Sequence, residues 1–221
     1  MSNLFDLTGK VAIVTGSSRG IGRATAEAMA AHGAKVVVSS RKADKCEEVA
    51  EEIKNNGGKA IVIPCHCSHK DQLQNLVDET LSTWGRIDSL VCNAAVNPFY
   101  GSLTEIPDEA YDKIMNTNVK SNVWLTSMVI PHMTKVGGGT IIIVSSVAAL
   151  IGSAKLGTYG LSKAADVALA RNIAVEWGGD NIRANCINPA IIRTDFARAL
   201  WENPEIYERA IKNYALHRIG E

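Results

Sequence analysis

The sequence has no excess of charge of either sign, since Lys and Arg together number 23 and Asp and Glu together also number 23. A protein that coats nucleic acid needs surplus positive charge to neutralise phosphate, so this balance argues against nucleic acid as the main partner. Aromatic residues make up only 5% of the chain. Hydrophobic residues as a whole make up 46%, which is too high for a disordered protein.

Signals for secretion or for a membrane are scarce. No basic segment followed by an apolar run opens the sequence, so we expect no signal peptide. One uncharged run, Val136–Ala154, reaches membrane length, but three glycines follow its first residue and Ser145, Ser146 and Ser153 interrupt it. We therefore expect a buried strand followed by a loop rather than a membrane span.

Cysteine is sparse and occurs an odd number of times. The five cysteines are Cys46, Cys65, Cys67, Cys92 and Cys186. Without a secretory signal, an odd set is typical of reduced thiols in a cytosol-like compartment, and a chain of this length buries enough surface to fold without a disulfide or metal staple.

Short β-branched runs alternate with longer amphipathic stretches along the chain. The apolar runs predict strands over residues 10–15, 35–39, 60–63, 88–92, 140–144 and 183–187. The stretches between them predict helices over 21–32, 43–56, 71–84, 108–135, 158–176 and, broken at Pro204, 194–216. Pro131 is expected to bend or end the helix at 108–135. The alternation indicates a single α/β domain, residues 1–221, built as a doubly wound parallel sheet of the Rossmann type.

The first strand runs into a glycine-rich turn, Thr15-Gly16-Ser17-Ser18-Arg19-Gly20-Ile21-Gly22. Gly16 allows the tight turn, Gly20 lets the backbone approach a pyrophosphate, and Gly22 lets the helix pack on the strand. The first amide groups of the helix would then face the phosphate. Such a loop alone is weak evidence, because an ordinary strand–helix turn is also rich in glycine.

Further polar residues fall at the predicted strand ends. Asn93 follows the fourth strand in Cys92-Asn93-Ala94-Ala95, and Ser146 follows the fifth. Tyr159 and Lys163 are four residues apart on the next helix and share one face, although in isolation they would pass for a surface pair. Together with the glycine spacing and Asn118, they resemble the short-chain dehydrogenase/reductase family over essentially the whole chain. Ala95 departs from the family's glycine.

The resemblance implies hydride transfer between a nicotinamide and a carbonyl carbon, with Ser146, Tyr159, Lys163 and Asn118 as the catalytic residues. Hydride addition leaves an alkoxide that needs a proton, and a phenol, whose pKa is about 10, donates one better beside a cation. Lys163 supplies that cation and can hold the nicotinamide ribose, while Ser146 donates to the carbonyl oxygen. Asn118 would hold a water that passes protons, and Ser145 is assigned to support of the strand end.

Cations rather than an acid follow the second strand. An acid there would bond the adenosine ribose and indicate NAD, whereas this chain has Ser40, Arg41 and Lys42, with Arg19 in the glycine loop. A guanidinium binds phosphate with two hydrogen bonds, so we predict NADP(H) over NAD(H); the alternative is that these are solvated surface cations. The other residues expected to contact the cofactor are Gly16, Ser18, Gly20, Ile21, Gly22, His66, Cys67, Asn93, Ala94, Tyr159, Lys163, Pro189, Ile192 and Thr194.

Four potential metal ligands fall within Cys65-His66-Cys67-Ser68-His69. Neighbouring side chains of an extended chain point to opposite faces, and a closed zinc site needs four convergent ligands. We therefore predict no metal site. The resemblance implies that this loop covers the adenine, with His66 where the family has Asp.

The segments that flank the predicted site, residues 96–100, 147–151 and 191–201, are apolar, and a lid is expected over about 191–215. Parts of the chain, such as 36–42 and 93–99, are similar to the family branch of NADPH-dependent carbonyl and retinal reductases, some of them peroxisomal. This implies a hydrophobic ketone or aldehyde as substrate, although an apolar wall is also typical of any core. The residues expected to contact it are Val96, Phe99, Ser146, Val147, Tyr159, Ile191, Phe196 and Trp201.

Two other functions stay open. One is another alcohol dehydrogenase of the same family, such as a 3-oxoacyl thioester reductase. The other is an idle NADP(H)-binding sensor or scaffold, which would have no need to keep Ser146, Tyr159 and Lys163 together. The resemblance also implies a tetramer or dimer formed through the helices at 108–135 and 158–176, with a small-molecule substrate and neither nucleic acid nor a membrane as partner.

Family members usually add a helix and a seventh parallel strand after the sixth. The end of this sequence, His217-Arg218-Ile219-Gly220-Glu221, is similar to the lead-in to that segment. We therefore expect a longer natural protein, and a bare sheet edge at 183–187 in this chain. The expected location is the cytoplasm, or the peroxisome if a targeting tripeptide follows.

Overall fold

The computed structural model describes residues 4–221. Within them, the strands are β1 Val11–Thr15, β2 Lys35–Ser39, β3 Lys59–Val62, β4 Ser89–Cys92, β5 Gly139–Val144 and β6 Ile182–Ile187. The α-helices are α1 Gly20–Ala31, α2 Ala43–Asn55, α3 Lys70–Trp84, α4 Asp108–Ile114, α5 Ser121–Lys135, α6 Gly157–Trp177, α7 Arg198–Trp201 and α8 Pro204–Ile211. The predicted strands and the helices before Asp108 agree with these bounds to within a residue at each end.

The six strands form one parallel sheet in the order β3-β2-β1-β4-β5-β6. The chain builds outward from β1 to β3 and then returns to place β4 on the other side of β1. In such sheets, ligands bind beyond the carboxyl ends of the strands where the order reverses, which here is between β1 and β4. The predicted doubly wound fold is confirmed.

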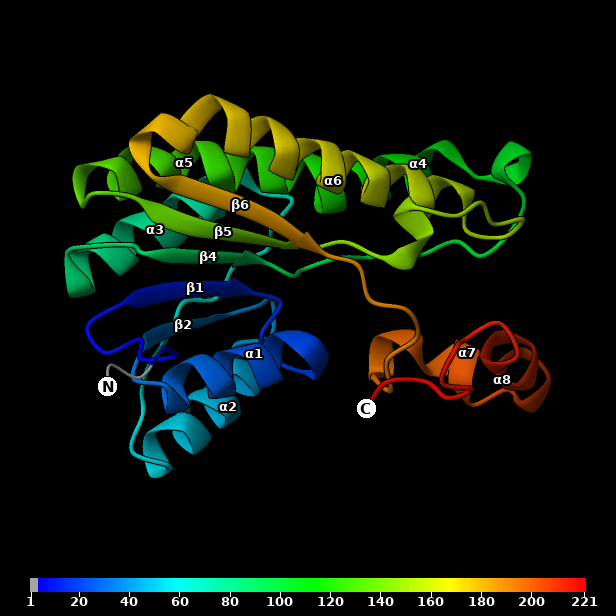
Figure 1. The fold of residues 1–221 in the computed structure, drawn as a ribbon, viewed down its shortest axis with the longest axis horizontal. Coiled ribbons are helices and arrows are strands. Elements are labelled where there is room, and N and C mark those ends of the chain that lie inside the picture. Colours follow the sequence, from blue (N-terminus) through cyan, green and yellow to red (C-terminus); the bar gives the residue numbers. More distant parts are fainter. Residues whose placement is uncertain (1–3) are drawn as a thin grey trace.

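Helices cover both faces of the sheet, with α1 and α2 on one face and α3, α5 and α6 on the other (Figure 1). The strands supply both cores by alternation: Ile13 packs with Leu73 and Leu125, whereas Val14 packs with Ala26 and Val49. No helix among residues 4–221 is both long and apolar enough to span a bilayer, and the uncharged run at 136–154 folds as β5 and the loop after it.

Strand β6 lies at the sheet edge and pairs only with β5 within the described residues, as expected. Burial alternates along β6, because Ile182 and Ala184 are buried whereas Arg183 between them is exposed. The short helices α7 and α8 lie beyond the carboxyl end of β6 (Figure 1).

The predicted helix at 108–135 is in fact three segments. A π-helical turn, Met115–Lys120, separates α4 from α5. Pro131 lies inside α5 without ending it, because Val129, Ile130 and Met133 on the same helix are anchored in the core. The final predicted helical stretch ends at Ile211, five residues earlier than predicted.

Candidate active site

The glycine loop joins β1 to α1 as predicted, with positive φ angles at Gly16 (66°) and Gly20 (55°). Gly22 packs so closely that a Cβ there would lie 2.5 Å from the Gly16 carbonyl oxygen. Ser18 and Ile21 are half-buried, and Arg19 is exposed. The α1 N-terminus has no side-chain cap and no acid in its first turn, so its free amide groups fit a pyrophosphate.

Asn93 fixes the glycine loop to β4. Its side-chain Nδ2 donates to the backbone oxygens of Thr15 (2.9 Å) and Gly16 (3.2 Å). The backbone amides of Asn93 and Ala94 both donate to the Thr15 hydroxyl, at 3.0 and 3.1 Å. Asn93 is therefore more than a turn former after a strand, because it holds together the ends of the two strands at the switch point.

Tyr159 and Lys163 lie on one face of α6, where the helix starts beside the carboxyl end of β5. The Lys163 ammonium nitrogen lies 5.8 Å from the centroid of the Tyr159 ring. The Lys163 side chain is only 2% exposed, and its ammonium donates to the Val144 carbonyl at 2.9 Å. Val144 is the residue directly before Ser145. Ser145 donates to the Lys163 backbone oxygen at 2.7 Å, in line with its predicted supporting role.

Ser146 directly follows that strand end and begins a short turn, Val147–Ala149, with its hydroxyl accepting from the Ala148 amide at 3.1 Å. The hydroxyl hydrogen is left to donate elsewhere. Val147 follows Ser146 and donates from its amide to the Pro189 carbonyl at 2.9 Å. The strand end, Ser146 and the loop after β6 are thereby held side by side.

Asn118 lies in the π-helical turn and is fully buried. Its side-chain oxygen accepts from the Val96 amide at 2.8 Å, and its Nδ2 donates to the Val96 carbonyl and the Ser162 hydroxyl. Both amide hydrogens are therefore used to connect the loop after β4 with α6, which is a positioning arrangement.

A buried carboxylate pairs with Lys163, and the sequence reasoning missed it. Asp166 Oδ2 lies 3.0 Å from the Lys163 ammonium, and Asp166 Oδ1 accepts from Asn122 on α5 at 2.9 Å. Burial raises the pKa of Asp166, while the Lys163 charge and the Asn122 hydrogen bond act in the opposite direction. The signal was present, since Asp166 follows Tyr159 by seven residues and so lies on the same helical face.

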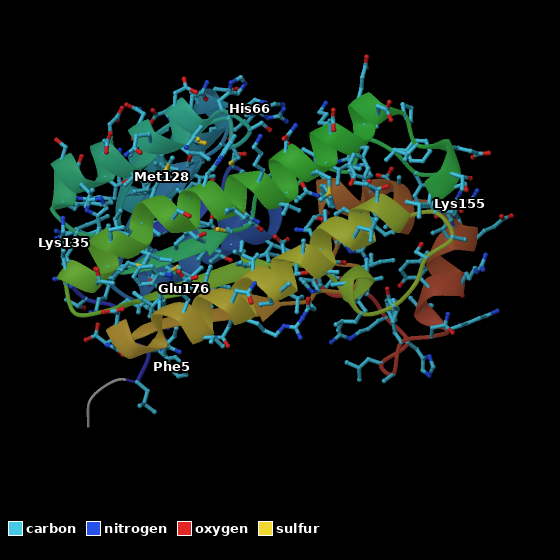
Figure 2. The ribbon with its side chains drawn as sticks, turned by 90° about the horizontal axis from the view of Figure 1, so that it is seen from above. Phe5, His66, Met128, Lys135, Lys155 and Glu176 are labelled. Atoms are coloured by element: carbon cyan, nitrogen blue, oxygen red, sulfur yellow. The ribbon has the colours of Figure 1, made fainter. Side chains whose placement is uncertain are left out.

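The cations after β2 lie beside the loop predicted to cover the adenine. Ser40 accepts from the Lys42 amide at 3.2 Å, and among residues 4–221 neither Arg41 nor Lys42 forms an ion pair. The Cys65 amide donates to the Ser40 carbonyl at 3.1 Å, which joins the two segments. Burial first, and then the charge of Arg41, lowers the pKa of His66. His66 lies near the start of α3 (Figure 2).

Cys65 and Cys67 in the same loop are buried, and a hydrogen bond between them raises the pKa of Cys65 and lowers that of Cys67. All five cysteines are free thiols. Within the described part of the chain, no three side chains of His, Cys, Asp or Glu gather in a way that would hold a metal ion.

The segment after β6 folds back over the glycine loop. A Cβ on Gly20 would lie 3.2 Å from the Thr194 methyl group, and Arg19 pairs with Asp195 at 3.6 Å. Trp201 Nε1 donates to the Thr194 carbonyl at 2.9 Å, and the Phe196 ring lies 6.3 Å from the Tyr159 ring. The predicted lid therefore reaches both the phosphate loop and Tyr159.

Ile191 and Ile192 pair with Gly220, which anchors the base of the lid. Phe99, in the loop after β4, lines a small cavity together with Leu103, Leu156 and Tyr159. Val96, three residues before Phe99, is held in place by two hydrogen bonds with Asn118. The structure thus brings Tyr159 close to both Phe99 and Phe196.

A parallel doubly wound sheet with an uncapped glycine loop at its switch point defines a dinucleotide-binding protein. A family model described as short chain dehydrogenase matches residues 10–205. The chain belongs to the short-chain dehydrogenase family, and it is therefore an oxidoreductase that uses a nicotinamide cofactor. The predicted family is confirmed.

Dehydrogenase/reductase SDR family member 4 of Bos taurus is 43% identical over 215 residues, covering 97% of this chain and 77% of the relative. The protein of that name from Caenorhabditis elegans is 39% identical, with 99% and 86% covered. A solved 7α-hydroxysteroid dehydrogenase, complexed with NADH and 7-oxo glycochenodeoxycholic acid, has a TM-score of 0.93 at 36% identity, with 98% and 84% covered. A short-chain type dehydrogenase/reductase from Mycobacterium marinum has a TM-score of 0.92 at 36% identity, with 98% and 85% covered.

Proposed function

We propose that this oxidoreductase interconverts a hydrophobic ketone or aldehyde and its alcohol with NADP(H), and that Tyr159 is the general acid and base. The observation that carries the proposal is the ammonium of Lys163, buried and 5.8 Å from the Tyr159 ring centroid at the carboxyl end of β5. A buried cation beside a phenol stabilises the phenolate, which eases proton transfer in either direction.

When bound, the nicotinamide cofactor supplies or accepts the hydride. The first amides of α1 would hold its pyrophosphate, and the ammonium of Lys163 keeps a third hydrogen for a ribose hydroxyl after the two it gives to Val144 and Asp166. Ser146 would orient the carbonyl oxygen, and Tyr159 would give that oxygen its proton in reduction and remove it in oxidation. Asn118 positions the loop that carries Val96.

The preference for NADP(H) rests on residues 40–42. Ser40 puts no carboxylate beside the ribose 2′ position, and the charges of Arg41 and Lys42 are not neutralised by an ion pair within residues 4–221. Both are then available to a 2′-phosphate. Because the steroid dehydrogenase was solved with NADH, family membership alone does not select the cofactor.

A hydrophobic substrate is supported by the apolar side chains around Tyr159. The Phe196 ring of the lid lies 6.3 Å from the Tyr159 ring and is 51% exposed, so its apolar surface is free to contact a ligand beside Tyr159. The 7-oxo glycochenodeoxycholic acid bound to the solved steroid dehydrogenase is a bulky ketone of the same chemical class. The exposed Val123 on α5 and Leu161 on α6 support the proposal of a homo-oligomer through those helices.

The Tyr159→Phe variant tests the assignment. It removes one hydroxyl, so it should abolish NADPH-dependent reduction across a panel of aromatic diketones, retinal, steroid ketones and 3-oxoacyl thioesters. Binding of NADPH, followed by its fluorescence, should stay near the wild-type affinity. Turnover by Tyr159→Phe at the wild-type rate would refute the role of Tyr159, and no turnover by the wild type on any panel member would refute the substrate class.

A further inference from the structure

Lys163 is held by a chain of hydrogen bonds that joins three elements. Its ammonium pairs with Asp166 Oδ2 at 3.0 Å, Asp166 Oδ1 accepts from Asn122 Nδ2 at 2.9 Å, and that same nitrogen donates to the Asn118 carbonyl at 2.7 Å. The chain therefore runs from α6 through α5 to the π-helical turn. Asp166 and Asn122 are buried, with exposures of 0% and 4%.

Asp166 carries its charge in this arrangement. Both of its carboxylate oxygens accept hydrogen bonds from nitrogen, one of them from an ammonium. A buried ammonium and carboxylate in contact stabilise each other, whereas either one alone would carry a large desolvation cost. Asp166 thus fixes where the Lys163 nitrogen lies and offsets part of its positive charge.

Two buried or half-buried thiols, Cys92 and Cys186, also lie near Asp166. Burial first, and then the charge of Asp166, raises the pKa of Cys92 on β4 well above its ordinary value. The same causes raise the pKa of Cys186 on β6 to about 11, with Lys163 and Arg171 acting in the opposite direction. Both thiols are neutral at physiological pH, so Lys163, Asp166 and Arg171 are the charged groups named on this side of the site.

We infer that Asp166, supported by Asn122, is a positioning residue that sets the pH at which Tyr159 gives up its proton, by holding the Lys163 ammonium and offsetting its charge. The inference rests on the proposed role of Tyr159. A carboxylate on the same helical face disfavours a second anion, the phenolate, so its removal should favour phenolate formation. Tyr159 should then ionise at a lower pH.

The size of the expected change in the ionisation midpoint follows from the distance between Tyr159 and Asp166 along the helix. Tyr159 and Asp166 are seven residues apart, a rise of about 10 Å. One charge at about that distance, in a medium with an effective dielectric constant of about 20, changes an ionisation midpoint by about one pH unit.

The experiment compares Asp166→Asn with the wild type in the pH dependence of kcat for alcohol oxidation with NADP. The midpoint of the rising limb should move about one pH unit lower in the variant, and Asp166→Glu should restore it towards the wild-type position. Glu176→Gln is the matched control, because it removes one carboxylate from the far end of the same helix, where Glu176 is exposed (Figure 2). It should leave the midpoint unchanged.

A spectroscopic measurement separates this inference from the proposed function. The ultraviolet absorbance of tyrosinate, taken as a difference against a Tyr159→Phe background, gives the ionisation midpoint of Tyr159 without any turnover. A lower midpoint in Asp166→Asn supports the inference even if no substrate is turned over. An Asp166→Asn midpoint equal to or higher than that of the wild type, with or without a slower rate, overturns it.

Asp166→Ser serves if Asp166→Asn does not fold, because the smaller side chain leaves room for water beside Lys163. It should shift the midpoint in the same direction, and an unshifted midpoint in this variant also overturns the inference. NADPH affinity and circular dichroism identify which variants are folded before the titration.

Discussion

Gly22→Ala tests the geometry of the phosphate loop, because two effects of opposite sign compete there. Gly22 lies in α1, and an alanine inside a helix is normally favoured over glycine by up to about 1 kcal/mol. In this structure the added Cβ would lie 2.5 Å from the Gly16 carbonyl oxygen and would also collide with the Asn93 side-chain amide. The Gly16 oxygen is backbone in a tight turn and has little room to move.

The collision should win. Overpacking costs about 1–3 kcal/mol, and loss of one hydrogen bond from Asn93 to the backbone of Thr15 or Gly16 costs about 1 kcal/mol more. After subtraction of the helical gain, Gly22→Ala should lower the free energy of unfolding by about 1–3 kcal/mol and weaken NADPH binding. Gly178→Ala is the matched control, because Gly178 has helical angles (φ −61°, ψ −33°) and open space around its Cβ position. It should raise the free energy of unfolding by about 0.4–1 kcal/mol.

Urea denaturation of both variants, with NADPH affinity measured in parallel, distinguishes the two outcomes. Combining Gly22→Ala with Asn93→Ala should cost less than the sum of the single changes, because one of the two collisions is removed. If Gly22→Ala were as stable as the wild type, or stabilised like Gly178→Ala, the close packing of Gly22 against Gly16 and Asn93 would be refuted.

Two further predictions follow from charges near the sheet. The double change Ser40→Asp with Arg41→Ala should lower the ratio of kcat/KM for NADPH over NADH by about tenfold for each charge-assisted hydrogen bond to the 2′-phosphate that is removed, and so reverse the cofactor preference. An unchanged ratio would contradict the role of residues 40–42. Asp88→Asn should lower the free energy of unfolding by about 1–2 kcal/mol near neutral pH, since Asp88 accepts from the Val11 amide and from Arg86. Although burial raises the pKa of Asp88, the hydrogen bonds and charge of Arg86 outweigh it and the pKa is lowered. The stabilisation is therefore present above the ordinary pKa of Asp and is lost as the pH falls through the lowered value, so urea titrations should show the difference shrink below about pH 4.

The strands and the main site residues were predictable because each depends on a local pattern. A β-branched run such as 35–39 between a glycine and a polar turn has few alternatives to a buried strand. Tyr159 and Lys163 share a face by helical spacing alone. The π-helical turn at 115–120 was not predictable in this way, because Asn118 bonds to partners 22 and 44 residues distant, Val96 and Ser162.

The same limit explains why Asp166 was missed. The helical period identifies its face, but whether a carboxylate on that face meets solvent or a buried ammonium depends on how closely α5 approaches α6, and Asn122 lies 44 residues earlier. Once the contact is known, its energetics join the residues together, because removing one member of a buried ion pair strands the other charge at a cost of about 3–5 kcal/mol. Lys163 therefore connects Tyr159 and Asp166, because its ammonium lies 5.8 Å from the Tyr159 ring centroid and 3.0 Å from Asp166 Oδ2.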